Sequence, residues 1–249
     1  MNIRDIKTKI NILFNINKLT NTMSMISFSK MKKIFKKCLI LNKLYSETRK
    51  IIFEIYNFNK NNFFCCILIT TNKGFCGNIN NEIIKYCLKF LKNNINLDLI
   101  IIGKKAIDFF SKRNIYIKKK IIFNEKKDVF FSKDVLNFLK YYENVFFLSS
   151  KIINNNIKII KTNLYEKIKK NFYEIDINYI DIINNYLNFT LNYLYSENYF
   201  SELKLRMTTM KSATDSSKKI IKNMNIIKNK IRQFKVTQEM LEIINSINL

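Results

Sequence analysis

Apolar residues recur at alternating steps of three and four along the first part of the chain. The segment from Ile3 to about Asn57 contains no Gly or Pro, the residues that most often end a helix. The spacing predicts one helix with a single contact stripe, interrupted by Lys30 and Thr48. At 1.5 Å per residue it would span roughly 80 Å, too long for the interior of an ordinary globular domain. The predicted stripe consists of Ile12, Ile16, Leu19, Met23 and Ile26, then Ile34, Cys38, Leu41, Tyr45, Ile52 and Ile55.

The last part of the chain shows the same spacing, from about Ile180 to Ile247. Two long periodic segments at the two chain ends favour an antiparallel coiled coil. Two core helices of a large bundle are the alternative, which the small number of other predicted helices disfavours. The second stripe is predicted at Leu203, Met207, Met210, Thr214, Ser217, Ile221, Met224, Ile227, Ile231, Phe234, Gln238, Leu241 and Ile244. Its middle, residues 212–217, is small or polar and would bury little apolar surface.

Between these segments, apolar runs of strand length alternate with amphipathic stretches of helix length. Such alternation predicts a small parallel sheet with helices on its faces, in a Rossmann-like α/β domain. We therefore expect a coiled-coil helix at 1–58, an α/β domain at 59–175 and a second coiled-coil helix at 176–249. Strands are predicted at 63–70, 97–102, 115–123 and 145–149, with a further strand or sheet edge at 154–161. Helices are predicted at 81–91, from after Gly103 to Phe110, and at 133–142.

Composition adds one alternative function and removes several. The net charge is +25, which suits a nucleic-acid partner, but the Lys residues are scattered along the chain rather than gathered in one stripe. The bias towards Ile, Lys and Asn, with no Pro, Trp or His, is typical of A/T-rich coding. Without His or a C-x-x-C pair, the five cysteines do not form a usual zinc or haem set and are expected to be reduced structural thiols. The sequence shows no signal peptide and no bilayer-spanning stretch.

The turn NKGFCGN after the first predicted strand is the strongest candidate for chemistry. Gly74 and Gly77 match neither G-x-G-x-x-G nor a Walker pattern, so we expect them to allow a sharp turn. Cys76 has no His to act as its base, and no carboxylate pair stands out. Asp215, among hydroxyl residues of the second stripe, is expected to make a satisfied polar contact. We predict no catalytic residue, no cofactor and no metal site.

Four stretches resemble the gamma subunit of the F-type ATP synthase, the central rotor of that enzyme. They are IKTKINILFNINKLTNTMSMISFSKMKK at 6–33, TNKGFCGNIN at 71–80, SELKLRMTTMKSATDSS at 201–217 and NKIRQFKVTQEMLEIINSI at 229–247. The last two are the most specific. The resemblance implies a non-catalytic shaft that couples rotation of the membrane c-ring to conformational change in the catalytic beta subunits. Its partners would be the alpha and beta subunits of the head, an epsilon-type subunit and the c-ring.

The resemblance also implies contact residues. Met23 and Arg206 would meet the lower part of the head, and an apolar chain end at Ile243, Ile244, Ile247 and Leu249 would turn in an apolar bearing. Arg206 and the C-terminal polar residues lie off the predicted stripe, which on sequence alone also suits a solvated face. The remaining candidates are Arg232, Gln233, Thr237 and Glu239 for the beta subunits and, from a shorter match, Tyr173, Glu174 and Asp176 for the ring.

The sequence departs from the family pattern at several places. Asn78 replaces a second Gly, Phe28 replaces a small residue, residues 154–170 are short for the family, and the cysteine pair of redox-regulated relatives is absent. The expected location is peripheral, on the cytoplasmic face of a bacterial inner membrane, or at an organelle inner membrane. The competing functions are a basic coiled-coil protein that binds nucleic acid and, less favoured, an enzyme with an unrecognised α/β site.

Overall fold

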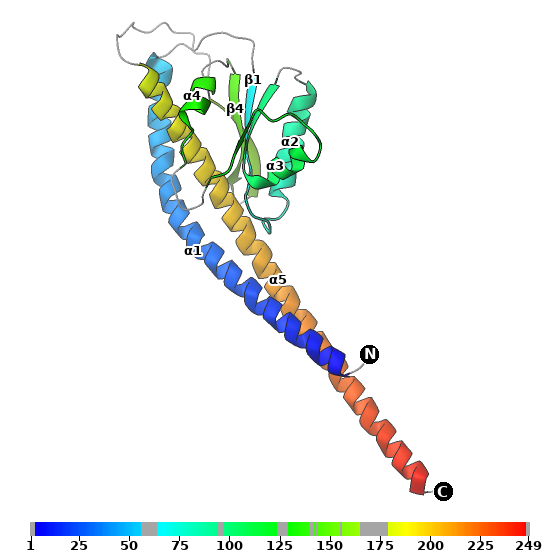
Figure 1. The fold of residues 1–249 in the computed structure, drawn as a ribbon. Helices are drawn as coiled ribbons and strands as arrows, with labels where there is room; N and C mark the ends of the chain where they lie inside the picture. The colour runs from blue at the N-terminus through cyan, green and yellow to red at the C-terminus, as the bar shows by residue number, and fades with distance from the viewer. Residues whose placement is uncertain are drawn as a thin grey trace. The chain divides into compact units, whose positions relative to one another are not determined.

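Two long helices, one from each end of the chain, accompany a five-stranded sheet in the computed structural model (Figure 1). The structure describes residues 3–55, 64–93, 97–123, 129–139, 142, 144–154, 156–164 and 179–247. Contacts divide the chain into two units. Residues 1–28 and 206–249 form the coil unit, and residues 29–205 form the α/β unit.

The terminal helices match their predicted extents. Helix α1 is Ile3–Ile55 and helix α5 is Tyr179–Ile247. Neither contains a Gly or Pro, so no residue removes a backbone hydrogen bond or adds the flexibility that would end the helix. The predicted end of the first helix, at 56–57, lies outside the described residues.

The sheet has the strand order β3-β2-β1-β4-β5. Strands β1 to β4 pair in parallel, which confirms the predicted parallel sheet, whereas the edge strand β5, for which no direction was predicted, pairs antiparallel with β4. The tight connection through Asn154, at φ 47°, explains the difference, because a short turn can only reverse the chain. The strands are β1 Phe64–Ile69, β2 Leu97–Ile102, β3 Lys119–Ile121, β4 Asn144–Ile153 and β5 Asn156–Asn163. The predicted strand at 115–123 is thus reduced to three residues.

Buried residues alternate between the two faces of β1, as the strand period requires. Cys65, Ile67 and Ile69 pack with side chains from α1, α4 and α5, whereas Cys66 and Leu68 pack with side chains from α2 and α3. The three shorter helices are α2 Ile79–Asn93, α3 Lys104–Ser111 and α4 Lys133–Leu139. The helix predicted at 133–142 ends earlier than expected: α4 stops at Leu139, and Tyr142 lies outside any helix.

The turn after β1 is held by its own side chains. The Asn80 amide donates to Thr71 Oγ1 at 2.8 Å, and its carbonyl oxygen accepts from the Thr71 N–H at 3.1 Å. Gly77 has φ 63°, which confirms its predicted role in the turn, whereas the left-handed neighbour is Phe75 rather than Gly74. Asn78, in place of the expected Gly, begins α2 by accepting the Glu82 N–H at its carbonyl oxygen, 3.1 Å away.

Candidate partner-contact surfaces

The two helices of the coil unit meet along a polar seam. The Asn17 amide of α1 donates to the Thr214 carbonyl oxygen at 2.7 Å and to Ser217 Oγ at 2.6 Å. Thr214 Oγ1 donates to Thr20 Oγ1 at 2.9 Å, and Ser24 Oγ donates to the Met207 carbonyl oxygen at 3.2 Å. Partner numbers on α5 fall as those on α1 rise, so the pair is antiparallel, as predicted.

The predicted stripe of the first helix is wrong within this unit. Ile12 and Leu19 are 59% and 62% exposed. From Leu13 to Ser27, each residue that faces α5 comes directly after a predicted one, and a step of one residue is a rotation of about 100° around the helix. The inward positions are Ile6, Ile10, Leu13, Asn17, Thr20, Ser24 and Ser27. The residues left outside are Ile12, Ile16, Leu19, Met23 and Ile26, here called the outer stripe.

Beyond residue 28, in the α/β unit, the predicted stripe is correct. Tyr45 and Ile52 are buried, and Ile34, Cys38 and Leu41 are half-buried. At the first predicted interruption, Lys30 is exposed, but its neighbour Met31 is half-buried, so an apolar residue continues the stripe there. At the second, Thr48 is half-buried, so the apolar stripe is interrupted by a polar residue, as predicted. The stripe of the α/β unit therefore continues the three- and four-residue spacing of the inward positions, through Ser27, Met31 and Ile34. It does not continue the spacing of the outer stripe.

The second predicted stripe holds over most of its length. Leu203, Met210, Thr214 and Ser217 are buried, and Met207, Ile221, Met224 and Ile231 are half-buried. Ile227 is exposed, and its neighbour Lys228 lies half-buried instead. The stripe ends at Ile231, because the later predicted positions are all exposed; they are Phe234, Gln238, Leu241 and Ile244.

The end of α5 has no described α1 residue beside it. Asn17 lies level with Thr214, so in an antiparallel pair Ile3, fourteen residues earlier, lies level with Lys228. Residues 232–247, here called the overhang, therefore extend past the described start of α1 (Figure 1). The exposed apolar side chains of the overhang are Phe234, Val236, Met240, Leu241, Ile243 and Ile244.

The four C-terminal candidates all lie exposed on the overhang, on two faces. Arg232 and Glu239 are two turns apart and share one face. Gln233 and Thr237 are one turn apart, and the Thr237 hydroxyl donates to the Gln233 carbonyl oxygen at 2.9 Å. Thr237 has Phe234, three residues earlier, as a helix neighbour, so this second pair lies beside an exposed apolar side chain.

The other two head-contact candidates differ in burial. Met23 is 38% exposed on the outer stripe, whereas Arg206 is only 8% exposed. The alternative that places Arg206 on a solvated face is therefore wrong. Asp215 is exposed, so its expected place within the seam is wrong as well. Phe28 is 42% exposed while Ser27 is buried, so the small residue needed at the helix contact is Ser27.

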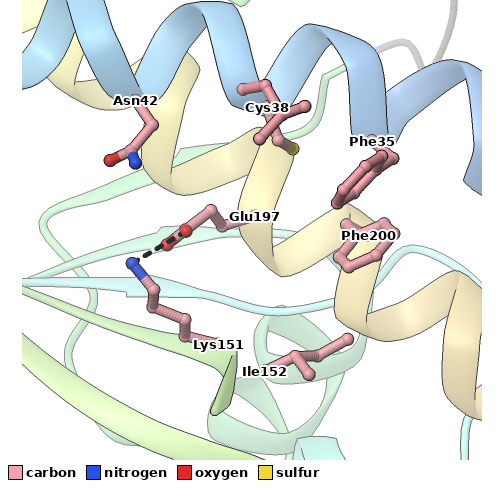
Figure 2. A pocket seen from close by; sticks show the side chains of 8 residues that line it. Phe35, Cys38, Asn42, Lys151, Ile152, Glu197 and Phe200 are labelled. Carbon is pink, nitrogen blue, oxygen red and sulfur yellow. Dashed lines mark ion pairs between the residues drawn. The ribbon is translucent and has the colours of Figure 1, made fainter. Parts of the chain in front are cut away.

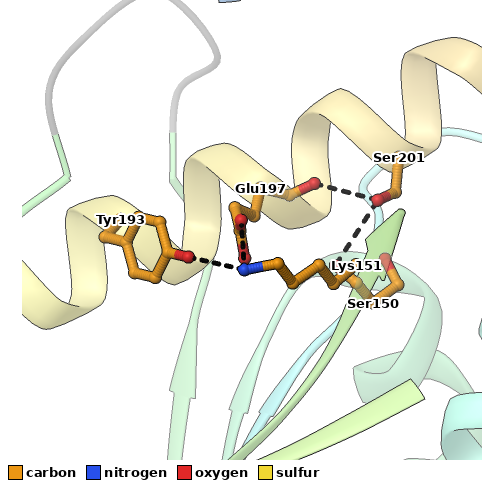
Figure 3. A network of polar contacts seen from close by, with 5 residues as sticks. All are labelled: Ser150, Lys151, Tyr193, Glu197 and Ser201. Atoms are coloured by element: carbon orange, nitrogen blue, oxygen red, sulfur yellow. Dashed lines mark hydrogen bonds and ion pairs between the residues drawn. The ribbon is translucent and has the colours of Figure 1, made fainter. Parts of the chain in front are cut away.

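The α/β unit was the candidate place for an enzyme site. In a sheet of this order, ligands bind beyond the carboxyl ends of the strands where the order reverses, here β1 and β4. Helix α5 supplies hydrogen bonds near the end of β4: Asn198 Oδ1 accepts from the Ser150 N–H at 3.2 Å and from Ser150 Oγ at 2.8 Å. Ser201 Oγ donates to the Ser150 carbonyl oxygen at 3.4 Å (Figure 3).

A small hollow lies nearby, between α1, α5 and β4. Its volume is about 160 Å³, and Phe35, Cys38 and Phe200 form part of its wall (Figure 2). Lys151 and Glu197 pair at its edge with Nζ and Oε1 2.9 Å apart. Burial, with a smaller effect from Glu197, raises the pKa of the Cys38 thiol to about 12, so this thiol is a poor nucleophile at neutral pH. Among the described residues, no group of three His, Cys, Asp or Glu side chains could hold a metal ion.

Comparison with known proteins accounts for nearly the whole chain. A family model described as ATP synthase matches residues 2–248. The ATP synthase gamma chain of Buchnera aphidicola subsp. Melaphis rhois is 33% identical over an alignment of 281 positions, gaps included, that covers 98% of this chain and 96% of that protein. The chain belongs to the ATP synthase gamma-chain family. A second gamma chain, from Mycoplasma capricolum, is 31% identical over 47% of this chain and 45% of its own length.

Solved structures share the fold of this gamma-chain family member. The rotor of the Euglena gracilis mitochondrial ATP synthase gives a TM-score of 0.73 at 15% identity, covering 94% of this chain and 98% of that one. A chain of the same enzyme's OSCP/F1/c-ring structure gives 0.76 at 17% identity, covering 99% and 93%. The terminal helices and central sheet thus follow the family's architecture.

Some candidates lie outside the described residues, and one contact residue was not predicted. Tyr173, Glu174, Asp176 and Leu249 lie outside the described part of the chain. Asn17 was not predicted as a helix-contact residue, although its place in an unbroken series of three- and four-residue steps was a signal for it.

No described helix is long and apolar enough to cross a membrane.

Proposed function

We propose that this chain is the central shaft of a proton-translocating F-type ATP synthase, without catalytic residues or cofactors of its own. Rotation of the c-ring would turn the shaft, and the shaft would change the conformation of the catalytic beta subunits. Family membership supports this role most directly.

The exposed apolar surface of the coil unit carries the contact part of the proposal. The outer stripe and the overhang leave large apolar side chains uncovered, among them Leu19 at 62% and Phe234 at 71% exposure. Exposed apolar surface on this scale marks a protein contact, because water disfavours it. We propose that the alpha and beta subunits of the head cover this exposed apolar surface. Met23, Arg232, Gln233, Thr237 and Glu239 are the proposed contact residues on this exposed surface. Arg206, which is 8% exposed, is proposed as a contact residue on the family resemblance alone.

The remaining partners are proposed on the family resemblance alone. An epsilon-type subunit and the c-ring would bind at the α/β unit, with Tyr173, Glu174 and Asp176 at the ring. The chain would then be peripheral to the membrane, on the cytoplasmic face of a bacterial inner membrane or at an organelle inner membrane. The division into helices at 1–58 and 176–249 around an α/β domain at 59–175 is part of the same proposal.

Co-purification tests the role. The full chain, expressed with the alpha and beta subunits from the same genome, should elute with both in one complex at a fixed ratio. Elution of the chain alone, or with nucleic acid in a salt-sensitive complex, would contradict the proposal. The comparisons give the nucleic-acid alternative no support.

The two faces of the overhang allow a sharper test in that complex. R232A/E239A and Q233A/T237A each remove one pair, and K235A/Q238A alters exposed neighbours as a matched control. If the candidate pairs contact the beta subunits, each candidate variant should lower ATP-driven rotation or coupled proton pumping severalfold more than the control does. Equal effects of all three variants would remove these four residues from the proposed contact.

A further inference from the structure

Two stripes compete for burial on α1 between Ile12 and Ser27. The outer stripe consists only of Ile, Leu and Met, yet it is exposed. The inward positions include Asn17, Thr20 and Ser24, which are half-buried and lie one residue after Ile16, Leu19 and Met23. Burial of apolar area alone would favour the opposite arrangement. A rotation of α1 by about 100° would exchange the two stripes.

Hydrogen bonds from α1 to α5 are made in the observed arrangement but not in the rotated one. Asn17 spans two acceptors, the Thr214 carbonyl oxygen and Ser217 Oγ, and Thr20 accepts from Thr214 Oγ1. In the rotated arrangement Ile16 and Leu19 would take these places, and neither side chain can donate or accept. Polar residues at buried coiled-coil positions commonly select one arrangement at a cost in stability.

We propose that Asn17, Thr20 and Ser24 fix the rotational phase of α1 in the coil unit and so keep the outer stripe exposed. The selection acts within residues 1–28 and 206–249. It is independent of the proposed function, because it does not depend on which partner covers the stripe.

Thiol modification in the full chain can measure the phase. Single variants I26C and S27C place a probe at an exposed and a buried position, 56% and 3% exposed in the native chain. Modification by N-ethylmaleimide, followed for each peptide by mass spectrometry, separates the probes from the five native thiols. With the native seam, Cys at 26 should react roughly tenfold or more faster than Cys at 27.

Each probe is then combined with the double variant N17L/T20L, which removes the polar side chains of Asn17 and Thr20 that are proposed to fix the phase. Leu is a strong helix former, so the helix itself should be kept. We expect the ratio of the two rates to fall by roughly tenfold or to invert, with helix content unchanged by circular dichroism. The matched control I16N/L19T places the same polar groups on the outer stripe and should leave the ratio as it is. An unchanged ratio in N17L/T20L would overturn the proposal.

A variant that loses helix content would still leave the question decidable. N17A removes the amide without adding a large apolar side chain, and it should lower the ratio severalfold. If N17A keeps the native ratio, the amide does not set the phase and the proposal fails.

Discussion

Lys151 on β4 and Glu197 on α5 form an ion pair with Nζ and Oε1 2.9 Å apart (Figure 3). The Lys151 ammonium also donates to the Tyr193 hydroxyl at 2.8 Å. Burial lowers the pKa of Lys151, but the hydrogen bonds with Tyr193 and Glu197 outweigh it, so the pKa is raised overall. Burial also raises the pKa of Tyr193 to about 12. Both groups therefore hold their protons more tightly in the folded chain.

These raised pKa values predict how the α/β unit loses stability at alkaline pH. The stabilisation is complete below the ordinary pKa values of 10.0 for Tyr and 10.5 for Lys. The part due to Tyr193 is lost as pH rises towards its raised pKa of about 12, and the part due to Lys151 is lost as pH rises through the raised pKa of that residue. Y193F removes one titrating group, so its stability should fall less steeply between about pH 9 and pH 11.5. Urea unfolding followed by circular dichroism at several pH values measures this slope. The control Y116F, at an exposed tyrosine, should keep the native slope; an equal slope in Y193F would contradict the prediction.

Asn198 should contribute to stability through β4. N198A leaves the buried Ser150 N–H and hydroxyl without their shared acceptor, which should lower the free energy of unfolding by about 1–3 kcal/mol. Urea unfolding at neutral pH measures the difference. N229A changes an exposed Asn of the same helix and should stay within about 0.5 kcal/mol of the native chain. A loss no larger than that of N229A would argue against the role of Asn198.

Gly103 should tolerate no side chain. Its φ is 107°, and an added Cβ would lie 2.2 Å from the Thr70 carbonyl oxygen. G103A should therefore destabilise the chain by at least about 2 kcal/mol in denaturant unfolding. G74A meets nothing within 4 Å, so its stability should be native or slightly higher. Equal stability of the two variants would show that the turn after β2 can relax.

The buried native thiols should react slowly. Cys65, Cys66, Cys76 and Cys87 are buried, and burial raises the pKa of the Cys65 and Cys66 thiols. Iodoacetamide at about pH 8 should modify these cysteines much more slowly in the native chain than in urea, because both access and thiolate formation are limited. Peptide mass spectrometry measures each rate. Rapid native modification of Cys66 would contradict its burial.

Most element boundaries could be predicted from the sequence because they depend on local signals. Apolar runs of strand length, the turn glycine Gly77 and the absence of helix breakers at both ends placed most elements within a few residues. The antiparallel direction of β5 could not be predicted this way, since strand pairing depends on the turn at Asn154.

Between Ile12 and Ile26, the predicted phase of α1 is wrong for a different reason. The predicted stripe steps eight residues from Ile26 to Ile34, whereas the observed series passes through Ser27 and Met31 in steps of three and four. Choosing the most apolar residue in each turn leads to the wrong face, because hydrogen bonds rather than apolar area decide it there. The burial of Arg206 could not be predicted for a similar reason, as residue type alone favours solvent.

The coil unit joins residues that are far apart in sequence: Asn17 and Ser217 are 200 residues apart. At about 5–20 residues per second, the ribosome adds the second of these roughly 10–40 s after the first. During that interval the N-terminal segment has no α5 beside its two competing stripes. Synthesis of this chain therefore exposes an aggregation-prone segment early, and chaperone binding to the nascent N-terminus would protect it.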